Sequence, residues 1–377
     1  MGKTIVSLVS DQTIPNVMFI KANGDAERLV FITTEGMEKR AKTDWILKSV
    51  GVNSEESIED RIIVSEGSIP EIQNKLSQYA VFDRNGEILV NLTGGNKIMS
   101  LAAYEFFKEK SLQNQNNIRM YYLNVGNDKF DMVFPSEQRN CVDSYHCNLE
   151  EYLTAYSIKQ EKAGKSPLME FEKTQEFYAN TFETEKNAIN ALHAGLSKKN
   201  KRFIDKYNKL PKELSNNQNI SRLFQKTFGN FESNKATIHY LRGGWFEEYV
   251  YFLIKRGLKL NEKQICLNLK IEDKSLSGKA VPNELDVIFI YKNKINIIEC
   301  KTGLKSEGGV NILQEVLYKQ SALKKGFGLT AKSFLFLPNV LSGNKERAEV
   351  FSIGIVDDKE MLLNEDRFKK EFLERLA

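Results

Sequence analysis

The sequence predicts an α/β protein with two α/β domains joined by a helical connector, and three observations support this fold class. Up to about residue 135, short apolar runs alternate with stretches of helical periodicity, as in a doubly wound sheet with crossover helices. The following stretch loses the strand-like runs and becomes rich in Lys and Asn, and from about Thr237 the apolar density returns. Because 377 residues are too many for one ordinary core, we expect domains over residues 1–135, 136–232 and 233–377.

In the first domain, apolar runs predict strands at residues 4–10, 28–34, 61–65, 87–93 and 118–125. Helical spacing between them predicts helices at residues 15–22, 36–50, 69–80 and 96–110. Pro15 and Pro70 fit the opening turn of a helix, where the missing N–H of proline leaves no hydrogen bond unmade. Ligands of doubly wound sheets bind at the carboxyl ends of the strands, so we expect a binding site in the turns that follow them.

The third domain is expected to open with a helix over residues 244–257. Strands are expected at residues 265–272, 284–291, 294–301 and 332–338, and helices at 309–325 and from about 364 to the end. The Lys-Asn-Lys turn between the second and third of these strands predicts a β-hairpin.

This hairpin carries acidic and basic side chains within the run PNELDVIFIYKNKINIIECKTG, residues 282–303. Glu284 and Asp286 are two residues apart on one strand, and Glu299 and Lys301 are two apart on the next. Strand side chains alternate between faces, so each pair is expected to project from one face. Carboxylates suit Mg²⁺ or Mn²⁺, and a lysine can position water and offset developing charge. The other interpretation is a salt bridge on a solvated sheet.

The runs ELDV and IIECK resemble the PD-(D/E)xK motif of restriction-endonuclease-like nucleases. Asp286, Glu299 and Lys301 stand in the motif positions, and the proline is displaced to Pro282. The resemblance implies a restriction-endonuclease-like α/β domain and a metal-dependent phosphodiester hydrolase. Asp286 and Glu299 would hold Mn²⁺ or Mg²⁺, and Lys301 would assist the attack of water.

Such nucleases usually add an acid from an earlier helix, and the run GGWFEEYV offers Glu247 or Glu248. On a helical wheel Glu247 borders the buried stripe, whereas Glu248 shares its side with Lys255, so Glu247 is favoured as the catalytic and metal-binding acid. A surface charge on an amphipathic helix is the alternative for either residue. Lys319 and Gln320, on the following helix, could touch a substrate phosphate or could belong to an exposed helix face.

In the first domain, the turn after the strand at 87–93 contains Thr93, Gly94, Gly95, Asn96 and Lys97. Glycines let backbone N–H groups approach an anion, the start of a helix adds favourable partial charge, and the lysine supplies a cation. An ordinary turn capped by Thr or Asn is the alternative.

A second polar turn follows the first strand. With the start of the next helix, it comprises Ser10, Asp11, Gln12, Thr13, Pro15 and Asn16. In a doubly wound sheet the two turns would face one crevice, and Thr33 and Thr34 after the second strand could join them. The acidic Asp11 favours recognition of a ribose or a base over a pure phosphate clamp.

Together the two turns resemble the CARF family, the CRISPR-associated Rossmann-fold sensors of cyclic oligoadenylates. A Rossmann-like CARF domain ahead of a PD-(D/E)xK nuclease is similar to the CRISPR ancillary nucleases activated by cyclic tetra-adenylate. The resemblance implies a homodimer that binds one two-fold symmetric ring, because the same residues then serve both halves of the ligand. It further implies cleavage of single-stranded DNA or RNA, or nicking of duplex DNA, in type III CRISPR defence.

Two other functions stay open at this point. One is a non-catalytic CARF regulator that binds nucleic acid, and the other is a ring nuclease that degrades the cyclic oligoadenylate in the crevice of the first domain.

Composition narrows the function classes. With 54 basic and 50 acidic residues the formal net charge is only +4, so any site for a polyanion must be local. With only three histidines in the chain, catalysis that depends on a histidine pair or triad is not favoured.

No apolar run approaches the ~20 residues that span a bilayer, and no signal peptide pattern is visible, so we expect a cytoplasmic protein without membrane contact. A basic run in the connector is either a solvated helix face or a phosphate contact. It comprises Lys198, Lys199, Lys201, Arg202, Lys206, Lys209 and Lys212.

Overall fold

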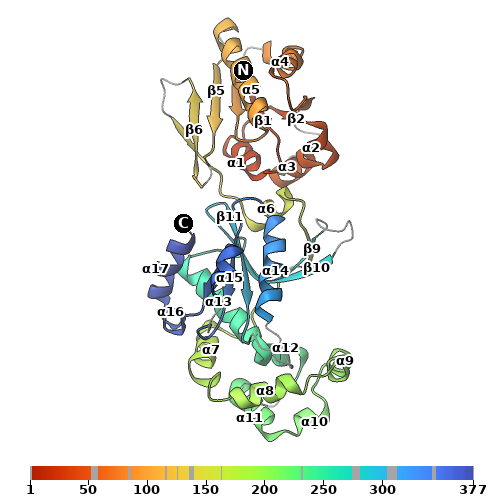
Figure 1. Cartoon of the computed structure of the whole chain (residues 1–377), viewed down its shortest axis with the longest axis vertical. Coiled ribbons are helices and arrows are strands. Elements are labelled where there is room, and N and C mark those ends of the chain that lie inside the picture. Colours follow the sequence, from red (N-terminus) through yellow and green to blue (C-terminus); the bar gives the residue numbers. More distant parts are fainter. Residues whose placement is uncertain are drawn as a thin grey trace.

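The computed structural model contains two β-sheets, one in each half of the chain, with helices around and between them (Figure 1). It describes residues 2–51, 58–83, 86–114, 117–124, 126–135, 140–162, 164–230, 232–273, 281–303, 312–341 and 345–376. The first sheet has seven strands in the order β3-β2-β1-β4-β5-β6-β7, and the second has six in the order β13-β12-β11-β10-β9-β8. The predicted α/β class, with a helical region between two α/β units, is confirmed.

The strands of the first sheet are β1 (Lys3–Leu8), β2 (Arg28–Thr33), β3 (Ile58–Ile63), β4 (Glu87–Asn91), β5 (Asn117–Tyr122), β6 (Lys129–Phe134) and β7 (Cys141–Asp143). Those of the second are β8 (Lys159–Lys162), β9 (Ile265–Asp273), β10 (Val281–Tyr291), β11 (Lys294–Cys300), β12 (Lys332–Phe336) and β13 (Ile353–Val356).

The helices up to residue 155 are α1 (Ile14–Ala22), α2 (Glu35–Lys39), α3 (Lys42–Val50), α4 (Ile69–Ser77), η1 (Ala80–Asp83), α5 (Lys97–Asn114) and α6 (Leu149–Ala155). The connector contributes α7 (Phe171–Glu176), η2 (Phe177–Thr181), α8 (Lys186–Ala194), α9 (Lys198–Tyr207), α10 (Lys212–Ser215) and α11 (Gln218–Phe228). The remaining helices are α12 (Lys235–His239), η3 (Tyr240–Gly244), α13 (Trp245–Gly257), α14 (Ile312–Lys325), α15 (Lys345–Val350), α16 (Lys359–Leu363) and α17 (Glu365–Leu376).

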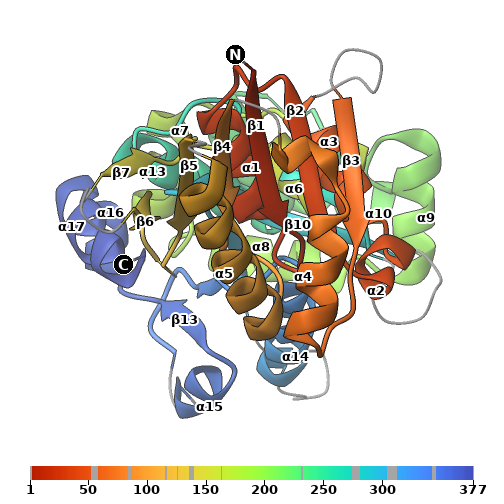
Figure 2. The same cartoon turned by 90° about the horizontal axis from the view of Figure 1, so that it is seen from above.

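In the first sheet, β1 to β5 run parallel and β6 and β7 continue it antiparallel. Alternating side chains divide its two faces: Val6 and Leu8 pack in the cluster that includes α4 and α5, and Ile5 packs in the cluster that includes α1 (Figure 2). The order β3-β2-β1-β4-β5 reverses direction between β1 and β4, which is where a doubly wound sheet opens a crevice at its carboxyl edge. Both predicted polar turns leave the sheet at this point.

Several predicted elements of the first half need correction. The helix expected at 36–50 is wrong as a single element, because the left-handed backbone of Ala41, with φ of 53°, separates α2 from α3. The predicted strands form but end one to three residues earlier than expected, where their polar turns begin. The short strands β6 and β7 were not predicted, since they lack the apolar runs of the buried strands.

In the second half, the predicted hairpin is confirmed, with Tyr291 paired to Lys294 across a two-residue turn. Lys292 and Asn293 have φ of 48° and 56°, as a type I′ turn requires. β11, β12 and β13 run parallel. The sequence did not predict β8, α15, β13 and α16, because each is too short to show a clear hydrophobic periodicity. The first residues of the helix expected at 309–325 lie outside the described residues.

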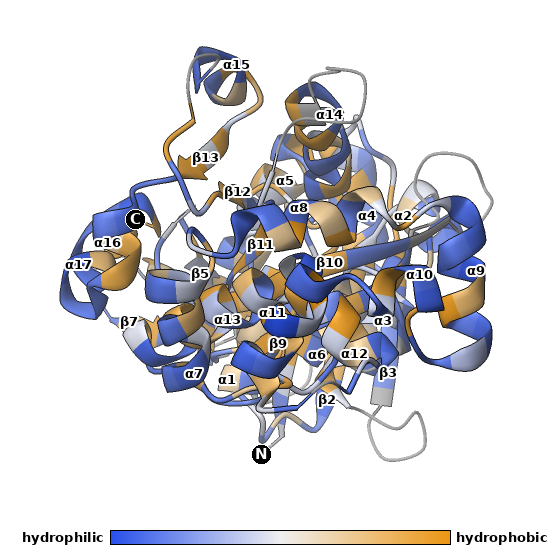
Figure 3. Cartoon of the chain, turned by 90° about the horizontal axis from the view of Figure 1, so that it is seen from below, coloured by the Kyte–Doolittle hydropathy of each residue, from blue (hydrophilic) through white to orange (hydrophobic). Residues whose placement is uncertain are grey.

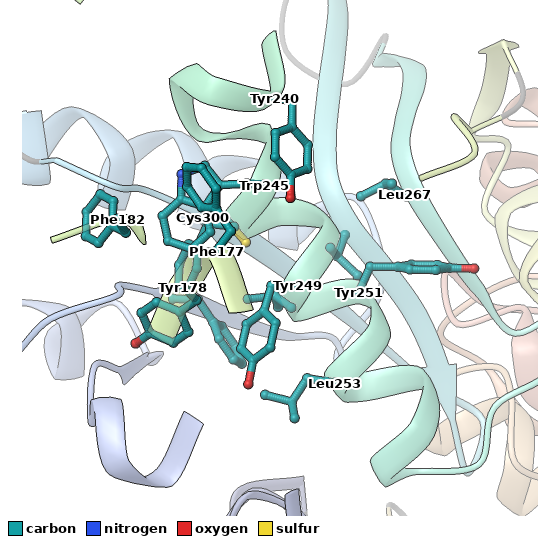
Figure 4. Packing of buried hydrophobic residues seen from close by; sticks show 14 of the residues in the cluster. Phe177, Tyr178, Phe182, Tyr240, Trp245, Tyr249, Tyr251, Leu253, Leu267 and Cys300 are labelled. Carbon is teal, nitrogen blue, oxygen red and sulfur yellow. The ribbon is translucent and has the colours of Figure 1, made fainter. Parts of the chain in front are cut away.

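Aromatic side chains attach the connector to the nuclease-motif half. Trp245 of α13 lies 5.2 Å from the ring of Phe177 and 4.8 Å from that of Phe182, and Tyr249 lies 5.2 Å from Tyr178 (Figure 4). These rings belong to one buried cluster that also contains Val287 and Ile298 of the hairpin. The connector therefore fixes the position of α13 against the sheet. Its α9, which carries much of the basic run, is largely hydrophilic (Figure 3).

A shared core joins the two halves. One cluster contains Phe19 and Phe130 from the first half, Tyr152 of α6, and Ile290 and Phe327 from the second. The hydroxyl of Tyr152 donates a hydrogen bond of 2.7 Å to the carbonyl of Phe327. α6 thus lies between the two sheets (Figure 1). Within the described residues, none of the helices combines the length and the apolarity that a bilayer span needs.

Candidate functional site

The hairpin brings together the three side chains of the predicted nuclease motif. Lys301 Nζ lies 2.6 Å from Glu299 Oε1 and 3.8 Å from Asp286 Oδ2. Asp286 Oδ2 also accepts a hydrogen bond of 2.7 Å from the backbone N–H of Cys300. The side chains of Glu299 and Asp286 are 8% and 13% exposed and that of Lys301 is 30% exposed. A largely buried acid pair beside an accessible lysine differs from the salt bridge on a solvated sheet that was the alternative.

The two glutamates of α13 have different hydrogen-bond partners. Asn268 Nδ2 donates a hydrogen bond of 2.7 Å to Glu247 Oε2. The neighbours of Asn268, Leu267 and Leu269, pair with Val287 and Leu285, the neighbours of Asp286 on β10. Glu248 instead accepts hydrogen bonds of 2.8 Å and 3.1 Å from the backbone N–H groups of Leu168 and Met169. Glu247 therefore lies on the side of the hairpin acids, and Glu248 holds the connector.

Asn268, which bonds the candidate acid Glu247, was not predicted from the sequence. It is 4% exposed and has a left-handed backbone, with φ of 52°. Leu267 and Leu269 on either side of it belong to different core clusters, although residues two apart in a regular strand share a face. The left-handed residue interrupts the alternation and lets a polar side chain reach Glu247. The available signal was an asparagine in the middle of the apolar run ICLNLKI.

The surroundings in this cluster disfavour the ionised forms of Glu247 and Asp286 and favour the ionised form of Lys301. Burial raises the pKa of Glu247 to about 7, against the opposing charge of Lys301 and the hydrogen bond from Asn268. Burial and the charges of Glu299 and Glu247 raise the pKa of Asp286 well above its usual range. Burial alone would lower the pKa of Lys301, but the charges of Asp286 and Glu299 outweigh it and raise the pKa. Close carboxylates with raised pKa values are typical of functional sites.

The donor set suits a hard divalent cation. Asp286, Glu299 and Glu247 offer carboxylate oxygens, the ligands that Mg²⁺ and Mn²⁺ prefer. A cation beside Asp286 would offset the burial and the negative charges of Glu299 and Glu247 that raise the pKa of Asp286. Among the described residues, no three His, Cys, Asp or Glu side chains yet stand close enough together to form a metal site. The ammonium group of Lys301 holds Glu299 instead.

Lys319 and Gln320 have different environments. Gln320 is 1% exposed, and its Nε2 donates a hydrogen bond of 3.0 Å to the carbonyl of Phe334 on β12. The interpretation as part of an exposed face is therefore wrong for Gln320, because α14 turns this residue into the sheet. Lys319 is exposed.

At the carboxyl edge of the first sheet, the two polar turns are in contact. A Cβ atom on Gly94 would lie 1.9 Å from the carbonyl oxygen of Leu8, so only glycine allows the turn after β4 to approach β1 this closely. Thr93 Oγ1 accepts a hydrogen bond of 2.9 Å from the N–H of Leu123, and Asn96 Nδ2 donates one of 2.9 Å to the carbonyl of Glu66. The turns after β1, β3, β4 and β5 thus form one connected edge.

Part of the predicted ligand set lies inside the protein. Thr13, Asn16, Thr33 and Thr34 are buried, and all four use side-chain atoms within the fold. Thr13 donates to the carbonyl of Ala155, and Asn16 donates to that of Leu8. Pro15 opens α1 as expected. These residues hold the shape of the edge.

Gly94 is also buried, and most of the other predicted ligand residues are accessible. Ser10, Gln12 and Gly95 are partly exposed, and Asp11, Asn96 and Lys97 are exposed. Lys97 opens α5, and within the described part of the chain no acidic side chain forms an ion pair with it.

Two cations beside Asp11 were missed by the sequence interpretation. Arg40 Nη1 lies 2.6 Å and 2.9 Å from the two carboxylate oxygens of Asp11, and Lys42 Nζ lies 3.4 Å from one of them. The short run RAK at the break between α2 and α3 was the available signal. Because two cations face the single carboxylate of Asp11, this edge of the sheet retains positive charge that suits an anionic ligand.

Comparisons with known protein families give one match in each half of the chain. Residues 4–152 match the model of the Card1 CARF domain, and residues 234–375 match the model of the Card1-like endonuclease domain. Among curated proteins no sequence matches the chain.

Solved structures share the fold over nearly the whole chain. Protein VC1899 from Vibrio cholerae matches with a TM-score of 0.79 and 18% identity, covering 100% of this chain and 99% of that one. Can2 from Sulfobacillus thermosulfidooxidans, solved with cyclic tetra-adenylate, matches with a TM-score of 0.72 and 21% identity, covering 97% and 98%. A type III CRISPR defence DNA nuclease activated by cyclic oligoadenylate matches with a TM-score of 0.56 and 16% identity, covering 96% of this chain and 51% of that chain.

The two family matches follow one another in the order that the two polar turns and the acidic hairpin predict. The chain therefore belongs to the CARF-domain nucleases, with a Card1 CARF domain in its N-terminal half and a Card1-like endonuclease domain in its C-terminal half.

Proposed function

We propose that this protein is a metal-dependent nuclease that a cyclic oligoadenylate, most simply cyclic tetra-adenylate, activates in type III CRISPR defence. In this proposal residues 1–135 sense the ring, residues 136–232 connect the halves, and residues 233–377 cut single-stranded DNA or RNA or nick duplex DNA. The observation that carries the proposal is the pairing, in one chain, of the acidic cluster around Lys301 with a sensor edge that carries the cations Lys97, Arg40 and Lys42.

On the sensor side, Lys97 and the backbone of the turn from Thr93 to Asn96 would bind phosphates of the ring. Lys97 is exposed at the start of α5, where the helix dipole also favours an anion. Arg40 and Lys42 supply further positive charge beside Asp11. A ring with two-fold symmetry suits a homodimer, because two copies of the same edge would bind its two halves.

On the nuclease side, Asp286, Glu299 and Glu247 would hold Mn²⁺ or Mg²⁺. Bound there, the cation would offset charge on the phosphodiester and acidify a water molecule. Lys301 is held beside Glu299 and Asp286 and would position the attacking water and stabilise the developing negative charge. Asn268 orients Glu247 through its hydrogen bond.

Gln12 offers a physical link between the two sites. Its Oε1 accepts hydrogen bonds of 3.0 Å from the hydroxyl of Tyr156 and 3.0 Å from the N–H of Leu329 in the endonuclease half. A ring bound at the turn of Gln12 would therefore act directly on contacts that the endonuclease domain makes. Differential binding of the ring to two arrangements of these contacts is what activation requires.

The test is cleavage of end-labelled single-stranded DNA, single-stranded RNA and plasmid, with and without cyclic tetra-adenylate and Mn²⁺. We expect cleavage only when both are present. Glu299→Ala should abolish it, and Glu315→Ala, which removes an exposed acid of α14, should not. The proposal fails if no strand is cut under any condition or if Glu299→Ala cuts as fast as the wild type.

A further inference from the structure

Arg242 lies in η3, the π-helical turn from Tyr240 to Gly244 that leads directly into the active-site helix α13. Single π-helical turns are rare and often mark functional sites. The next residue, Gly243, has φ of 142°, a backbone conformation that side chains rarely allow. Arg242 precedes Glu247 by five residues, and the unusual backbone between them decides how the two side chains are placed.

The guanidinium of Arg242 has no anionic partner within the described residues. Its Nε is buried and makes no hydrogen bond, and no carboxylate forms an ion pair with the side chain. Burial lowers the pKa of Arg242. Arginine is rarely buried unless it is paired, because a charge that leaves water needs compensation. A half-buried arginine without an acid is therefore a place where an anion from outside the chain would be stabilised.

The surroundings of Arg242 connect it to the active site. A Cβ atom on Gly243 would lie 3.4 Å from Thr302 Oγ1, so the turn touches the residue that follows Lys301. His239, one turn earlier, lies in the electrostatic field of Arg242, Lys165 and Glu284, and burial together with the two cations lowers its pKa. Lys165 Nζ bonds Glu284 at 2.9 Å. Arg242 thus stands in a locally positive region next to the hairpin.

We propose that Arg242 binds a backbone phosphate of the nucleic-acid substrate beside the acidic hairpin and so positions the strand for cleavage. The inference rests on the proposed function, since it assumes a nucleic-acid strand at this site. The planar guanidinium matches phosphate geometry and can donate two parallel hydrogen bonds to it. The phosphate would supply the negative charge that no described residue of the protein places beside this guanidinium.

The test uses Arg242→Met, which keeps the length of the side chain but removes the charge, and Arg242→Lys, which keeps the charge. Arg222→Met, an exposed arginine of α11, is the matched control. Binding of fluorescein-labelled oligodeoxythymidylate and oligouridylate is measured by anisotropy with cyclic tetra-adenylate and EDTA, over a series of salt concentrations. Single-turnover cleavage with Mn²⁺ and the thermal midpoint of each variant are measured in parallel.

We expect Arg242→Met to weaken binding of the cleaved strand type about tenfold, as for one charge-assisted phosphate contact. The slope of log K against log salt should become shallower by about 0.7, and Arg242→Lys should restore most of the affinity. The thermal midpoint should stay level or rise, because an uncompensated charge is removed. Suppose that the wild type binds and cuts the strand. The inference is then overturned if Arg242→Met binds the strand as tightly as the wild type, or if its loss of affinity is accompanied by a lowered thermal midpoint. Absence of binding and cutting by the wild type overturns the proposed function itself.

Discussion

The sensor edge and the acidic hairpin differ in how well their polar and charged side chains are compensated by partners within the chain. At the sensor edge, buried Thr13 and Asn16 have hydrogen-bond partners inside the fold, and Asp11 is neutralised by Arg40 and Lys42. In the hairpin, acids are crowded together at low exposure, and burial raises the pKa of Glu247 to about 7. Apart from Lys97, the polar side chains named at the sensor edge therefore have partners within the chain, whereas burial opposes the ionisation of Glu247 and Asp286.

The difference fits the two proposed roles, ring binding at the sensor edge and metal-dependent cleavage at the hairpin. A binding edge benefits from a rigid backbone that is already in place, because ordering it on binding would cost affinity. A metal-dependent site benefits from carboxylates whose repulsion a cation relieves, because binding is then coupled to their ionisation. Variants that affect one region and leave the other intact would sharpen this comparison.

The largest effect is expected from Asp286→Asn. Removing one carboxylate from the cation-binding set should lower the cleavage rate at least ~10³-fold, which corresponds to a loss of roughly 4 kcal/mol of transition-state stabilisation. Ring binding, measured by calorimetry, should stay at the wild-type value. Asp366→Asn, at an exposed position of α17, should change neither quantity. A weakened affinity for the ring in Asp286→Asn would contradict the separation of the two sites.

A smaller effect is expected from Lys97→Ala. Losing a charge-assisted contact to phosphate should weaken ring binding about 10- to 100-fold. Cleavage at a saturating ring concentration should be restored, because the hairpin is untouched. Lys108→Ala removes an exposed lysine of the same helix and serves as the control. If Lys97→Ala binds the ring as tightly as the wild type, the sensor turn has been assigned wrongly.

A third prediction concerns stability without divalent cations. The pKa of Glu247 is raised from about 4.5 to about 7, so its folded form resists ionisation and the wild type loses free energy of unfolding as pH rises through this window. Glu247→Gln has no charge to bury, so its stability relative to the wild type should increase between pH 4.5 and 7, by up to about 3 kcal/mol, and then level off.

Urea unfolding in EDTA at a series of pH values measures this difference. Glu315→Gln, at an exposed position, should show no such trend. Added Mn²⁺ should stabilise the wild type more than Glu247→Gln. A relative stability of Glu247→Gln that does not change with pH would show that the carboxyl of Glu247 is solvated in the protein.

Patterns along the chain predicted much of the fold and part of the site. The parallel strands were visible because strands buried on both faces are continuous apolar runs, and the hairpin was visible because its turn lies between two of them. Short elements with mixed faces, such as β6, β7 and β13, produce no comparable signal. The break between α2 and α3 was missed because Ala41 adopts a left-handed backbone that its residue type does not indicate.

The sequence by itself determined the α/β class, the order of the two regions and the choice of Asp286, Glu299 and Lys301 as candidate site residues, because these depend on periodicity and on spacing within neighbouring strands. Only the tertiary structure bonded Glu247 to Asn268 and Glu248 to the connector, turned Gln320 inward, and brought Arg40 to Asp11. Each of these depends on the angle at which separate elements pack, and on partners that lie far apart along the chain. Local patterns carry no information on either.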